Sequence, residues 1–306
     1  MKEKILILGG NGFIGIHLIR KLRNMGYECF SLSLNKIDEK NKEDKINYLN
    51  ADISDFSELR EVIGLKKYDY VVNLSGYVDH SNLSSGGLSV INTHYGGLLN
   101  LLRIIDLDYV KKIVQIGSSE EYGNINSPQN ESMREEPISP YSFGKLACTK
   151  LLSMLSVSEK LPVVIIRLFL VYGEGQGFNR FLPQVIKGCL KNEEFPTSEG
   201  NQIRDFCYVS DIVDGIIATI KSEQVNGHIL NLASGQPIKI KSAIKKVVDI
   251  VGSGKPKFGQ IKYRSNENLS LYADISKAQK LISWKPKIDF ELGLKKTIDY
   301  YSKIIK

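Results

Sequence analysis

The sequence has little cysteine and little histidine, with four of each in 306 residues. The cysteines show no close pairing with one another and no metal-ligand spacing with the histidines; they are Cys29, Cys148, Cys189 and Cys207. A chain built around disulfides or a structural zinc needs such spacings. We therefore expect reduced, packed thiols, with no disulfide and no metal.

Long hydrophobic runs are also missing near the N-terminus. The first apolar run, Ile5 to Leu8, ends at a glycine after four residues. It is too short for a signal peptide or a membrane span, so we expect a cytoplasmic protein with no membrane partner. The chain is 42% hydrophobic and 25% charged, which suits an ordinary globular protein with a full core.

The formal charge of +7 has no concentrated source. Lysines are scattered and often lie beside acids, as in the segment Lys36 to Lys45. A nucleic-acid surface needs a basic stripe with interleaved aromatic residues, so we expect no nucleic-acid partner. The excess of positive charge suits the binding of small anionic ligands equally well.

What the sequence does have is an alternation of strand-length apolar runs with amphipathic helical segments. Continuous β-branched runs separated by helices are typical of a parallel sheet that is buried on both faces. We therefore predict a doubly wound α/β fold. The strand-like runs are Ile5 to Leu8, Cys29 to Leu34, Tyr70 to Leu74, Lys112 to Ile116 and Val163 to Leu168, and the helical segments are Phe13 to Met25, Ser89 to Ile105 and Tyr141 to Ser158.

The pattern changes after about Tyr172, where glycine-rich and polar loops separate shorter elements. We predict that residues 1–172, with returning segments near 205–232, form the doubly wound unit. Residues 173–306 then form mainly a smaller, interleaved lobe over the carboxyl edge of the sheet. Its predicted helices are Phe181 to Leu190, Asp211 to Ile220, Ile240 to Val251 and Ser276 to Leu281.

A glycine-rich loop follows the first strand and opens the first helix. Gly9, Gly12 and Gly15 have the spacing that allows a tight turn, close approach of the backbone to a pyrophosphate, and close helix packing. Phe13 and Ile14 begin the helix whose N-terminus faces the anion. This strand–loop–helix context predicts a dinucleotide cofactor on a Rossmann sheet.

The end of the second predicted strand bears on the choice of cofactor. An acidic residue there usually holds the ribose 2′-hydroxyl, whereas residues 31–36 carry no carboxylate. We therefore prefer NADP(H), with NAD(H) as the alternative, and expect Ser33 and Lys36 at the 2′-position; otherwise they are a solvated serine and a surface lysine. Asp52 and Ile53 follow another strand-like run and are candidates to clamp the adenine, although Asp52 suits helix capping nearly as well.

Tyr141 and Lys145 are four residues apart, which places them on one face of a predicted helix. The ammonium can lower the pKa of the phenol and make Tyr141 a proton donor and acceptor near neutral pH. This spacing is common by chance in a lysine-rich chain. Together with Ser118 and the glycine loop, however, it predicts redox chemistry at a carbinol carbon.

In these motifs the chain resembles the extended short-chain dehydrogenases/reductases of the nucleotide-sugar-modifying branch, the NAD-dependent epimerase/dehydratase family, over nearly its whole length. The resemblance implies an NAD(P)-binding domain with a substrate-binding lobe. The segments that carry it are Gly9 to Gly15, Asn73 to Gly76, Ser118 to Gly123, the Tyr141 and Lys145 pair, and Ile166 to Gly173.

The resemblance also implies roles for individual residues. Ser118 bonds the reacting sugar oxygen, Tyr141 passes the proton, and Lys145 lowers the tyrosine pKa and holds the nicotinamide ribose. Glu120 stands where dehydratases have a catalytic glutamate. Both Tyr141 and Lys145 then contact the cofactor, as does the segment made of Leu74, Ser75 and Gly76.

On the substrate side the resemblance implies a nucleotide-diphosphate sugar. Arg204 matches an arginine that binds the diphosphate, since a planar guanidinium meets phosphate oxygens bidentately; its alternative is a buried pair with Asp205 or Asp211. Arg264 and Glu267 resemble a later pair that grips phosphate and ribose. Further candidates for substrate contact are Ser119, Phe169, Asn179 and Arg180.

Three reactions share such a site: C4 epimerisation, 4,6-dehydration and reduction of a 4-keto sugar. Residues 174–183, 200–209 and 257–286 look similar to CDP-abequose and CDP-paratose synthases, and Ser118 to Gly123 resembles GDP-4-keto-6-deoxymannose reductases. We therefore favour NAD(P)H-dependent reduction of the C4 ketone of a nucleotide-4-keto-6-deoxyhexose, for deoxysugar and surface-polysaccharide (lipopolysaccharide) synthesis. The alternatives are a 4-epimerase, then a 4,6-dehydratase, and a catalytically silent dinucleotide-binding regulator.

Related extended members form dimers through two helices of each subunit, so the resemblance also implies a homodimer. The matching segments here, Ser89 to Ile105 and Lys145 to Leu155, carry enough apolar residues for such an interface. The same residues are equally suited to packing on the sheet. They include Leu98, Leu99, Leu102, Leu146 and Leu151.

Overall fold

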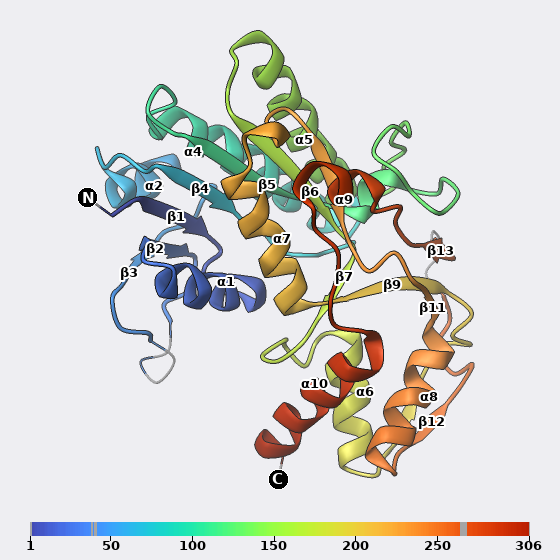
Figure 1. The fold of residues 1–306 in the computed structure, drawn as a ribbon. Helices are drawn as coiled ribbons and strands as arrows, with labels where there is room; N and C mark the ends of the chain where they lie inside the picture. The colour runs from blue at the N-terminus through green and yellow to red at the C-terminus, as the bar shows by residue number, and fades with distance from the viewer. Residues whose placement is uncertain (1, 38, 40–41, 264–267, 306) are drawn as a thin grey trace.

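The computed structural model describes residues 2–37, 39, 42–263 and 268–305. Its centre is a seven-stranded sheet in the order β10-β6-β5-β4-β1-β2-β3, and every pair of neighbours in it is parallel. Figure 1 shows this sheet crossing the upper half of the molecule. Its strands are β1 (Lys4–Leu8), β2 (Glu28–Ser33), β3 (Ile46–Asn50), β4 (Tyr70–Asn73), β5 (Lys112–Ser118), β6 (Val163–Leu168) and β10 (Ile229–Leu232).

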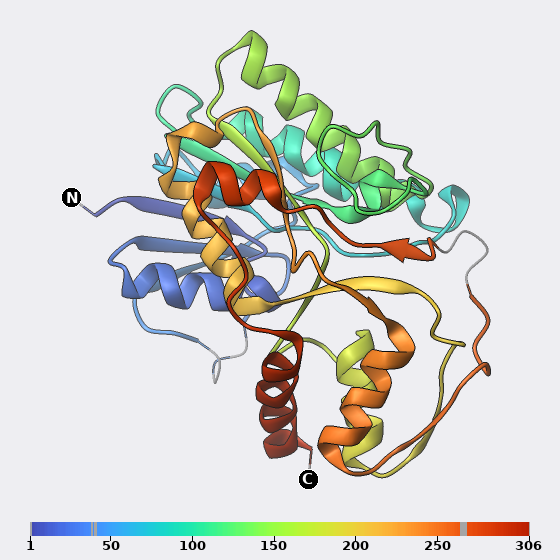
Figure 2. The same cartoon turned by 45° about the vertical axis from the view of Figure 1, so that its right-hand side comes forward.

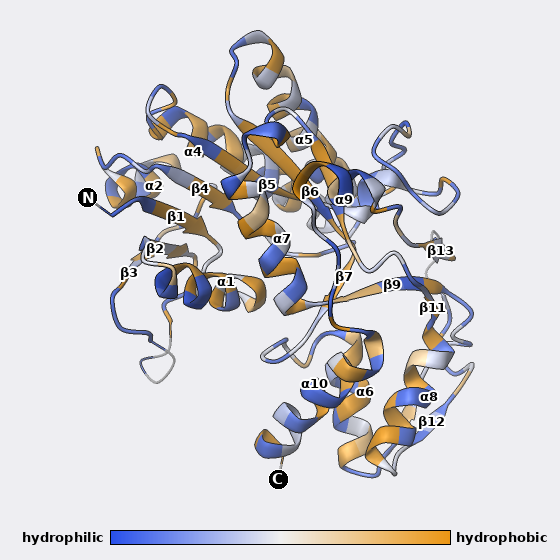
Figure 3. Ribbon diagram, viewed as in Figure 1, coloured by the Kyte–Doolittle hydropathy of each residue, from blue (hydrophilic) through white to orange (hydrophobic). Residues whose placement is uncertain are grey.

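Helices cover both faces of this sheet because its strands are apolar on both sides. α1 (Phe13–Asn24), α7 (Val209–Lys221) and α9 (Ser276–Ile282) contribute buried residues to one apolar cluster. α2 (Phe56–Ile63), α4 (Gly97–Ile104) and α5 (Pro140–Ser158) contribute to a second cluster on the other side. Figure 3 shows the central strands coloured hydrophobic between helices of mixed colour. The predicted doubly wound parallel fold is confirmed.

One predicted helix is more complex than its pattern suggests. The segment expected as a single helix from Ser89 to Ile105 consists of α3 (Gly87–Ile91), a π-helical turn (Asn92–Gly96) and α4. Backbone dihedrals stay in the α region across the junctions, so the axis continues while one turn is wider. Such π turns are rare and occur mostly at functional sites.

The chain then leaves the sheet, returns, and leaves again. β10 comes late in the sequence but pairs with β6 at the edge of the sheet, so the N-terminal unit is closed by a segment of the C-terminal half. A second sheet contains β7 (Leu170–Tyr172), β9 (Ile203–Tyr208), β11 (Pro237–Lys239) and β13 (Ser270–Leu271). β10 has no counterpart among the runs that we recognised as strands.

Below these sheets lie three helices, α6 (Phe181–Leu190), α8 (Ile240–Val251) and α10 (Phe290–Ile304). They share an apolar cluster with Tyr172, Phe206 and Tyr208, and Figure 2 shows them side by side away from the seven-stranded sheet. The sequence pattern predicted α6 and α8 but not α10. The remaining described elements are β8 (Glu194–Pro196), β12 (Lys255–Lys257) and the 3₁₀ turns at Leu83–Ser85, Ser119–Tyr122 and Glu223–Val225.

Candidate active site

The carboxyl ends of β1, β4 and β5 meet at one edge of the sheet, because neighbouring strands are parallel and in register. The glycine loop follows β1, and Gly9 adopts φ +75° with its Cα against the backbone of Leu74. A Cβ at Gly15 would lie 2.4 Å from the carbonyl oxygen of Gly9. A side chain at either position therefore collides with backbone, which explains the glycines.

The N-terminus of α1 is open towards this loop. Gly12 is its N-cap, and no described side chain caps its first amides. The first turn carries no acidic residue, while Phe13 and Ile14 pack against the core. Uncapped amides and the helix dipole favour an anion, so the loop fits the pyrophosphate of a dinucleotide.

The end of β2 is tied to the glycine loop. The Ser33 hydroxyl accepts a hydrogen bond from the Asn11 amide at 3.0 Å, and the Ser31 hydroxyl donates to the Asn11 side chain at 2.7 Å. Lys36, directly after a bend at residues 34–35, is exposed. Ser33 is thus a partner of the loop, and the roles predicted for Ser33 and Lys36 at a 2′-phosphate stay predictions.

Asp52 does not cap a helix. Its carboxylate accepts from the amide and hydroxyl of Ser54, at 2.8 and 2.7 Å, whereas Asp55 caps α2 by accepting from the amides of Ser57 and Glu58. The capping alternative for Asp52 is therefore wrong, because the N-cap of the helix is Asp55, three residues later. Ile53 is 6% exposed and packs against Gly97 of α4.

Leu74, Ser75 and Gly76 follow β4 and lie next to the π-helical turn. Ser75 is held through its amide by the Asn73 side chain at 3.1 Å, and Gly76 adopts φ +104°. A Cβ at Gly76 would lie 2.1 Å from the imidazole of His94. The close approach of these two segments therefore requires glycine at position 76.

The three residues predicted for the chemistry come together in the structure. Ser118 ends β5, while Tyr141 and Lys145 lie one turn apart near the start of α5. Their exposed fractions are 7%, 6% and 5%, and the Ser118 side chain is close enough to the Tyr141 phenol to lower its pKa. The Lys145 ammonium donates to the carbonyl oxygen of Ile116 at 2.9 Å. Packing thus fixes all three groups.

The protonation of this cluster differs from the expectation. Burial raises the pKa of the Tyr141 phenol, and the Glu120 carboxylate raises it further, while the bond with Ser118 and the charge of Arg180 lower it. Burial also lowers the pKa of the Lys145 ammonium. The expectation of a phenol pKa near neutral is wrong for the protein alone, because desolvation and the Glu120 charge outweigh the effects of Ser118 and Arg180.

Glu120 faces a histidine that the sequence analysis did not single out. The Nε2 atom of His80 lies 2.9 and 3.0 Å from the two carboxylate oxygens of Glu120, and both side chains are about one-third exposed. The ring of His80 lies 5.9 Å from that of Tyr141. Glu120 therefore belongs to an acid–base pair beside the phenol.

His94 is a second histidine that sequence reasoning missed. Its ring meets Tyr141 edge to face at 5.3 Å, and its Nε2 bonds the carbonyl oxygen of Tyr77 at 3.1 Å. Burial, helped by the charge of Lys145, lowers its pKa to about 3, so the ring is neutral and Nε2 donates. Their positions in the fold identify these two histidines, whereas the sequence shows them only as single residues without a motif.

The predicted substrate residues have mixed environments. Ser119 and Phe169 are buried, with exposed fractions of 5% and 6%. Phe169 packs against Tyr122 in a small apolar cluster. Asn179 and Arg180 are exposed at the start of α6, and Arg180 is close enough to influence the Tyr141 phenol. Substrate contact at these positions stays a prediction.

Arg204 lies on β9, half-buried, with Nη1 donating to the carbonyl oxygen of Ile203 at 2.9 Å. The carboxylates of the alternative pairing have other partners: Asp205 accepts from the amides of Ser234, Gly235 and Ala273. Asp211 accepts from the amides of Lys287 and Ile288. Arg264 and Glu267 lie outside the described residues.

Four further observations concern the remaining expectations. All four cysteines are free and buried. Within the described ranges, no group of three or more metal-ligating side chains is found, and no helix there is long and apolar enough to cross a membrane. Of the residues considered for a dimer face, Leu98 packs fully inside the core, whereas Leu99 is 37% exposed.

Comparison with known proteins identifies the family. The sequence profile described as the NAD dependent epimerase/dehydratase family matches residues 5–233. An uncharacterised protein of Methanocaldococcus jannaschii is 31% identical, over 98% of this chain and 97% of its own. A putative UDP-glucose 4-epimerase of the same organism is 29% identical, with 97% of both chains covered.

A solved structure agrees with this result. UDP-glucuronic acid 4-epimerase from Bacillus cereus, in complex with UDP-glucuronic acid and NAD, is 25% identical and superposes with a TM-score of 0.86 over 98% of this chain and 99% of its own. The profile covers more than half of the chain and the first relative nearly all of it. The chain belongs to the NAD dependent epimerase/dehydratase family.

Proposed function

We propose that the protein is an NAD-dependent 4-epimerase of a UDP-hexose or UDP-hexuronate. The observation that carries the proposal is the buried cluster of Ser118, Tyr141 and Lys145 at the same sheet edge as the glycine loop. Relatives of this chain that are named as 4-epimerases support C4 as the reacting carbon. This proposal replaces 4-keto reduction as our preferred function, because a relative and a solved structure named above carry the name of 4-epimerases.

Each residue of the cluster has one task in this reaction. A bound NAD would be held by the glycine loop, and it would supply the hydride acceptor for C4 and then the hydride donor for the resulting ketone. Tyr141 takes the proton of the C4 hydroxyl as the C4–H bond breaks, and gives it back when the ketone is reduced, so the cycle consumes nothing. Ser118 donates a hydrogen bond to the same oxygen. Lys145 lies one turn along α5 from Tyr141, with its ammonium held by the Ile116 carbonyl oxygen at 2.9 Å.

The raised pKa of Tyr141 in the protein alone fits this scheme when the cofactor charge is considered. An oxidised nicotinamide ring carries a positive charge, and a positive charge nearby favours the phenolate. The pKa of Tyr141 is therefore expected to fall when NAD⁺ binds. The phenolate would form where hydride transfer needs it.

The proposed substrate contacts are residues other than the three of the buried cluster. Arg204, Arg180 and Asn179 bind the diphosphate and sugar, with Ser119 and Phe169 nearer the sugar ring; Arg264 and Glu267 complete the set. For the cofactor, Gly9, Gly12 and Gly15 hold the pyrophosphate, and the segment Leu74 to Gly76 borders the nicotinamide side. Preference for NADP over NAD stays a prediction.

A second candidate, 4,6-dehydration, is favoured by the pair of Glu120 and His80. Epimerisation at C4 needs one acid–base group, whereas elimination of the C6 hydroxyl needs further proton transfers at C5 and C6. The pair lies beside Tyr141 and is accessible to solvent. The support for reduction of a 4-keto-6-deoxy sugar, in contrast, is only the similarity of several sequence segments to such reductases.

One assay separates the three reactions. Purified protein is incubated with UDP-glucose and UDP-glucuronic acid without added cofactor, and products are separated by chromatography and mass spectrometry. Isomers of unchanged mass support the proposal, and loss of one water supports dehydration. Stoichiometric oxidation of NADPH with a nucleotide-4-keto-6-deoxyhexose would instead establish the reductase and refute epimerisation.

We also propose a homodimer through the helices α3, α4 and α5. These helices expose large apolar side chains, with exposed fractions of 63% for Leu88, 51% for Phe143, 50% for Met154 and 73% for Val157. Exposed apolar surface of this kind is typical of protein interfaces. Sedimentation should give a dimer at micromolar concentration, and Val157→Glu with Met154→Glu should give a monomer.

A further inference from the structure

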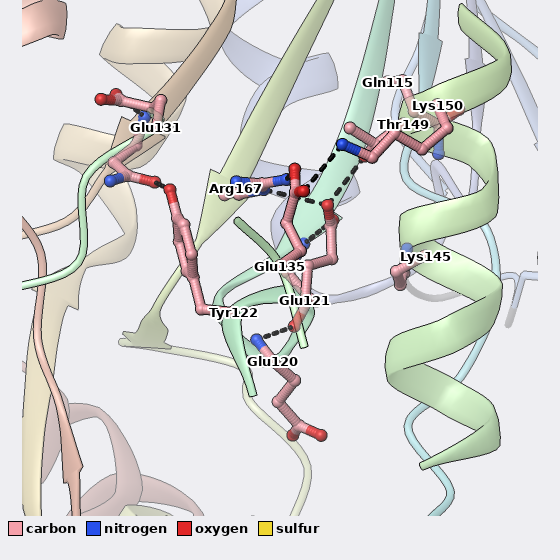
Figure 4. Close-up of polar contacts among 12 residues, drawn as sticks. Gln115, Glu120, Glu121, Tyr122, Glu131, Glu135, Lys145, Thr149, Lys150 and Arg167 are labelled. Atoms are coloured by element: carbon pink, nitrogen blue, oxygen red, sulfur yellow. Dashed lines mark hydrogen bonds and ion pairs between the residues drawn. The ribbon is translucent and has the colours of Figure 1, made fainter. Parts of the chain in front are cut away.

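A buried ionic cluster lies directly behind the reacting groups. Arg167 of β6 and Glu121 of the 3₁₀ turn have side chains with no exposed surface, and Arg167 Nε lies 2.9 Å from Glu121 Oε2. Arg167 Nη2 lies 2.6 Å from Glu135 Oε1, and Glu135 in turn pairs with Lys150 of α5 at 2.7 Å. Figure 4 shows these carboxylates between the Arg167 guanidinium and helix α5.

Stability alone is a poor explanation for this cluster. Removing charges from water costs several kcal/mol for each ion, and apolar residues of similar volume often stabilise a protein as well or better. Within the described residues, Arg167 Nη1 even lacks a hydrogen-bond partner, although the guanidinium stacks 4.4 Å from the Tyr122 ring. The cluster therefore calls for a geometric explanation.

Glu121 joins the two elements that carry the reacting groups. Its Oε1 accepts from the backbone amide of Ser118 at 2.8 Å, and its Oε2 accepts from the Thr149 hydroxyl at 2.8 Å. Thr149 follows Lys145 by four residues and Tyr141 by eight, so all three share one face of α5. One carboxylate thus ties the serine to the helix face that carries its partners.

Gly117 supplies an independent sign that this contact is built into the chain. A Cβ at position 117 would lie 2.4 Å from Glu121 Oε1. The carboxylate therefore reaches the Ser118 amide only because the preceding residue has no side chain. Arg167 then fixes Oε2 from the neighbouring strand, whose Cα at this point pairs with that of Gly117.

We propose that Glu121, held by Arg167, is a positioning residue that sets the separation between the Ser118 hydroxyl and the Tyr141 phenol. Glu121 does not contact the reacting atoms. Its effect is exerted through the backbone of Ser118 on one side and through Thr149 on the other. The inference rests on the proposed function for its kinetic readout but concerns a contact that can be measured without turnover.

The decisive variants are Glu121→Gln and Thr149→Val, with Glu135→Gln as matched control. Glu135→Gln also removes a carboxylate from Arg167, but Glu135 makes no described contact with Ser118 or Thr149. Because a misplacement of about 1 Å can cost about 100-fold in rate, kcat should fall about 100-fold in Glu121→Gln. It should fall less in Thr149→Val and change no more than about three-fold in the control. KM and NAD affinity should stay near wild type.

A pH profile gives a readout that loss of packing would not change. The Glu121 charge contributes to the raised pKa of Tyr141. In Glu121→Gln the ascending, acidic limb of the kcat profile, which reports ionisation of the Tyr141 base, should therefore move to lower pH, but not in Glu135→Gln. If Glu121→Gln does not fold, the double variant Glu121→Leu with Arg167→Met keeps an apolar core, and a folded double variant should still lose kcat.

Amide hydrogen exchange tests the geometry independently of the reaction. Exchange of the Ser118 amide should accelerate in Glu121→Gln and in the folded double variant, and stay slow in Glu135→Gln. A wild-type protein inactive on all nucleotide sugars would refute the proposed function but leave this measurement decisive. Unchanged Ser118 exchange, wild-type kcat in the folded double variant, or equal kinetic losses in Glu121→Gln and Glu135→Gln would overturn the positioning role.

Discussion

The reacting groups and the proposed substrate arginines lie in contrasting surroundings. Ser118, Tyr141 and Lys145 are less than a tenth exposed and are fixed by strand ends, a helix face and buried hydrogen bonds. Arg180 is exposed and Arg204 half-buried, on elements of the C-terminal half. In the proposed enzyme, the core therefore holds the groups assigned to the chemistry, while the residues assigned to recognition lie on surfaces that can vary without unfolding the sheet.

Removing the phenolic hydroxyl tests the rigid region and should have the largest effect. Tyr141→Phe should lower kcat about 1,000-fold, because general acid–base catalysis typically contributes 10²–10⁴-fold. NAD binding, measured by fluorescence titration, should change little. Tyr122→Phe is the control, since Tyr122 is also buried but donates to Asn231 at 2.8 Å. Turnover above a tenth of wild type in Tyr141→Phe would show that another group moves the proton.

Truncating an arginine tests the exposed region, where KM rather than kcat should respond. Arg204→Ala should raise KM for the nucleotide sugar about 10- to 100-fold, since hydrogen bonds to charged groups contribute about 1.5–3 kcal/mol. Arg204→Lys should recover only part of the loss because it cannot bind bidentately. Arg103→Ala is the control, because the Arg103 guanidinium of α4 lies over the Phe56 ring of α2. A fall in kcat alone would place Arg204 with the reacting groups.

The buried ring of His94 tests the rigid region through the pH dependence of the unfolding free energy. Its pKa is about 3 in the folded protein and 6.5 as a free side chain. The unfolded chain therefore binds the extra proton between these values, so the stabilisation is complete above pH 6.5 and is lost as pH falls towards 3. From pH 7 to 5 this one group should remove about 2 kcal/mol of unfolding free energy.

Denaturant titrations of wild type and His94→Gln at both pH values check this. The variant should lose about 2 kcal/mol less than wild type on acidification, whatever its stability at pH 7. An equal pH dependence in the two proteins would mean that His94 is solvated and does not pack against the Tyr141 ring.

The same contrast separates what local sequence predicts from what it does not. The apolar runs predicted β1, β5 and β6, and the spacing of Tyr141 and Lys145 predicted a shared helix face, because these depend on neighbouring residues. The π-helical turn escaped notice since buried Val90 and Leu98 continue a helix-like pattern across it. Glu121 was missed because its partner Arg167 is 46 residues away.

β10 and α10 were missed for a related reason. β10 is a strand of four residues at the sheet edge, and its pairing with β6 joins segments more than sixty residues apart. α10 has alternating charged residues over a narrow apolar stripe, with Leu294 and Ile298 buried against α6 and α8. Their identity depends on tertiary contacts that periodicity does not reveal.

Substitutions at the proposed adenosine end of the cofactor site should have the smallest effect. Like the proposed substrate arginines, the residues there are partly or fully exposed. Ser33→Asp adds a carboxylate that can still accept from the Asn11 amide, so the loop is kept while a 2′-phosphate is repelled. If Ser33 and Lys36 contact that phosphate, the ratio of KM for NADPH to KM for NADH should rise about 10-fold, or 1.4 kcal/mol.

Ser33→Ala and Lys36→Met make this test specific. Ser33→Ala loses the bond to Asn11 without adding charge, so it should weaken both cofactors alike, whereas Lys36→Met should weaken NADPH alone. An equal change for the two cofactors in Ser33→Asp would mean that Ser33 acts only through the glycine loop. Cofactor choice would then have to lie with other residues beyond β2, and Ser33 would have to be grouped with the rigid part of the site.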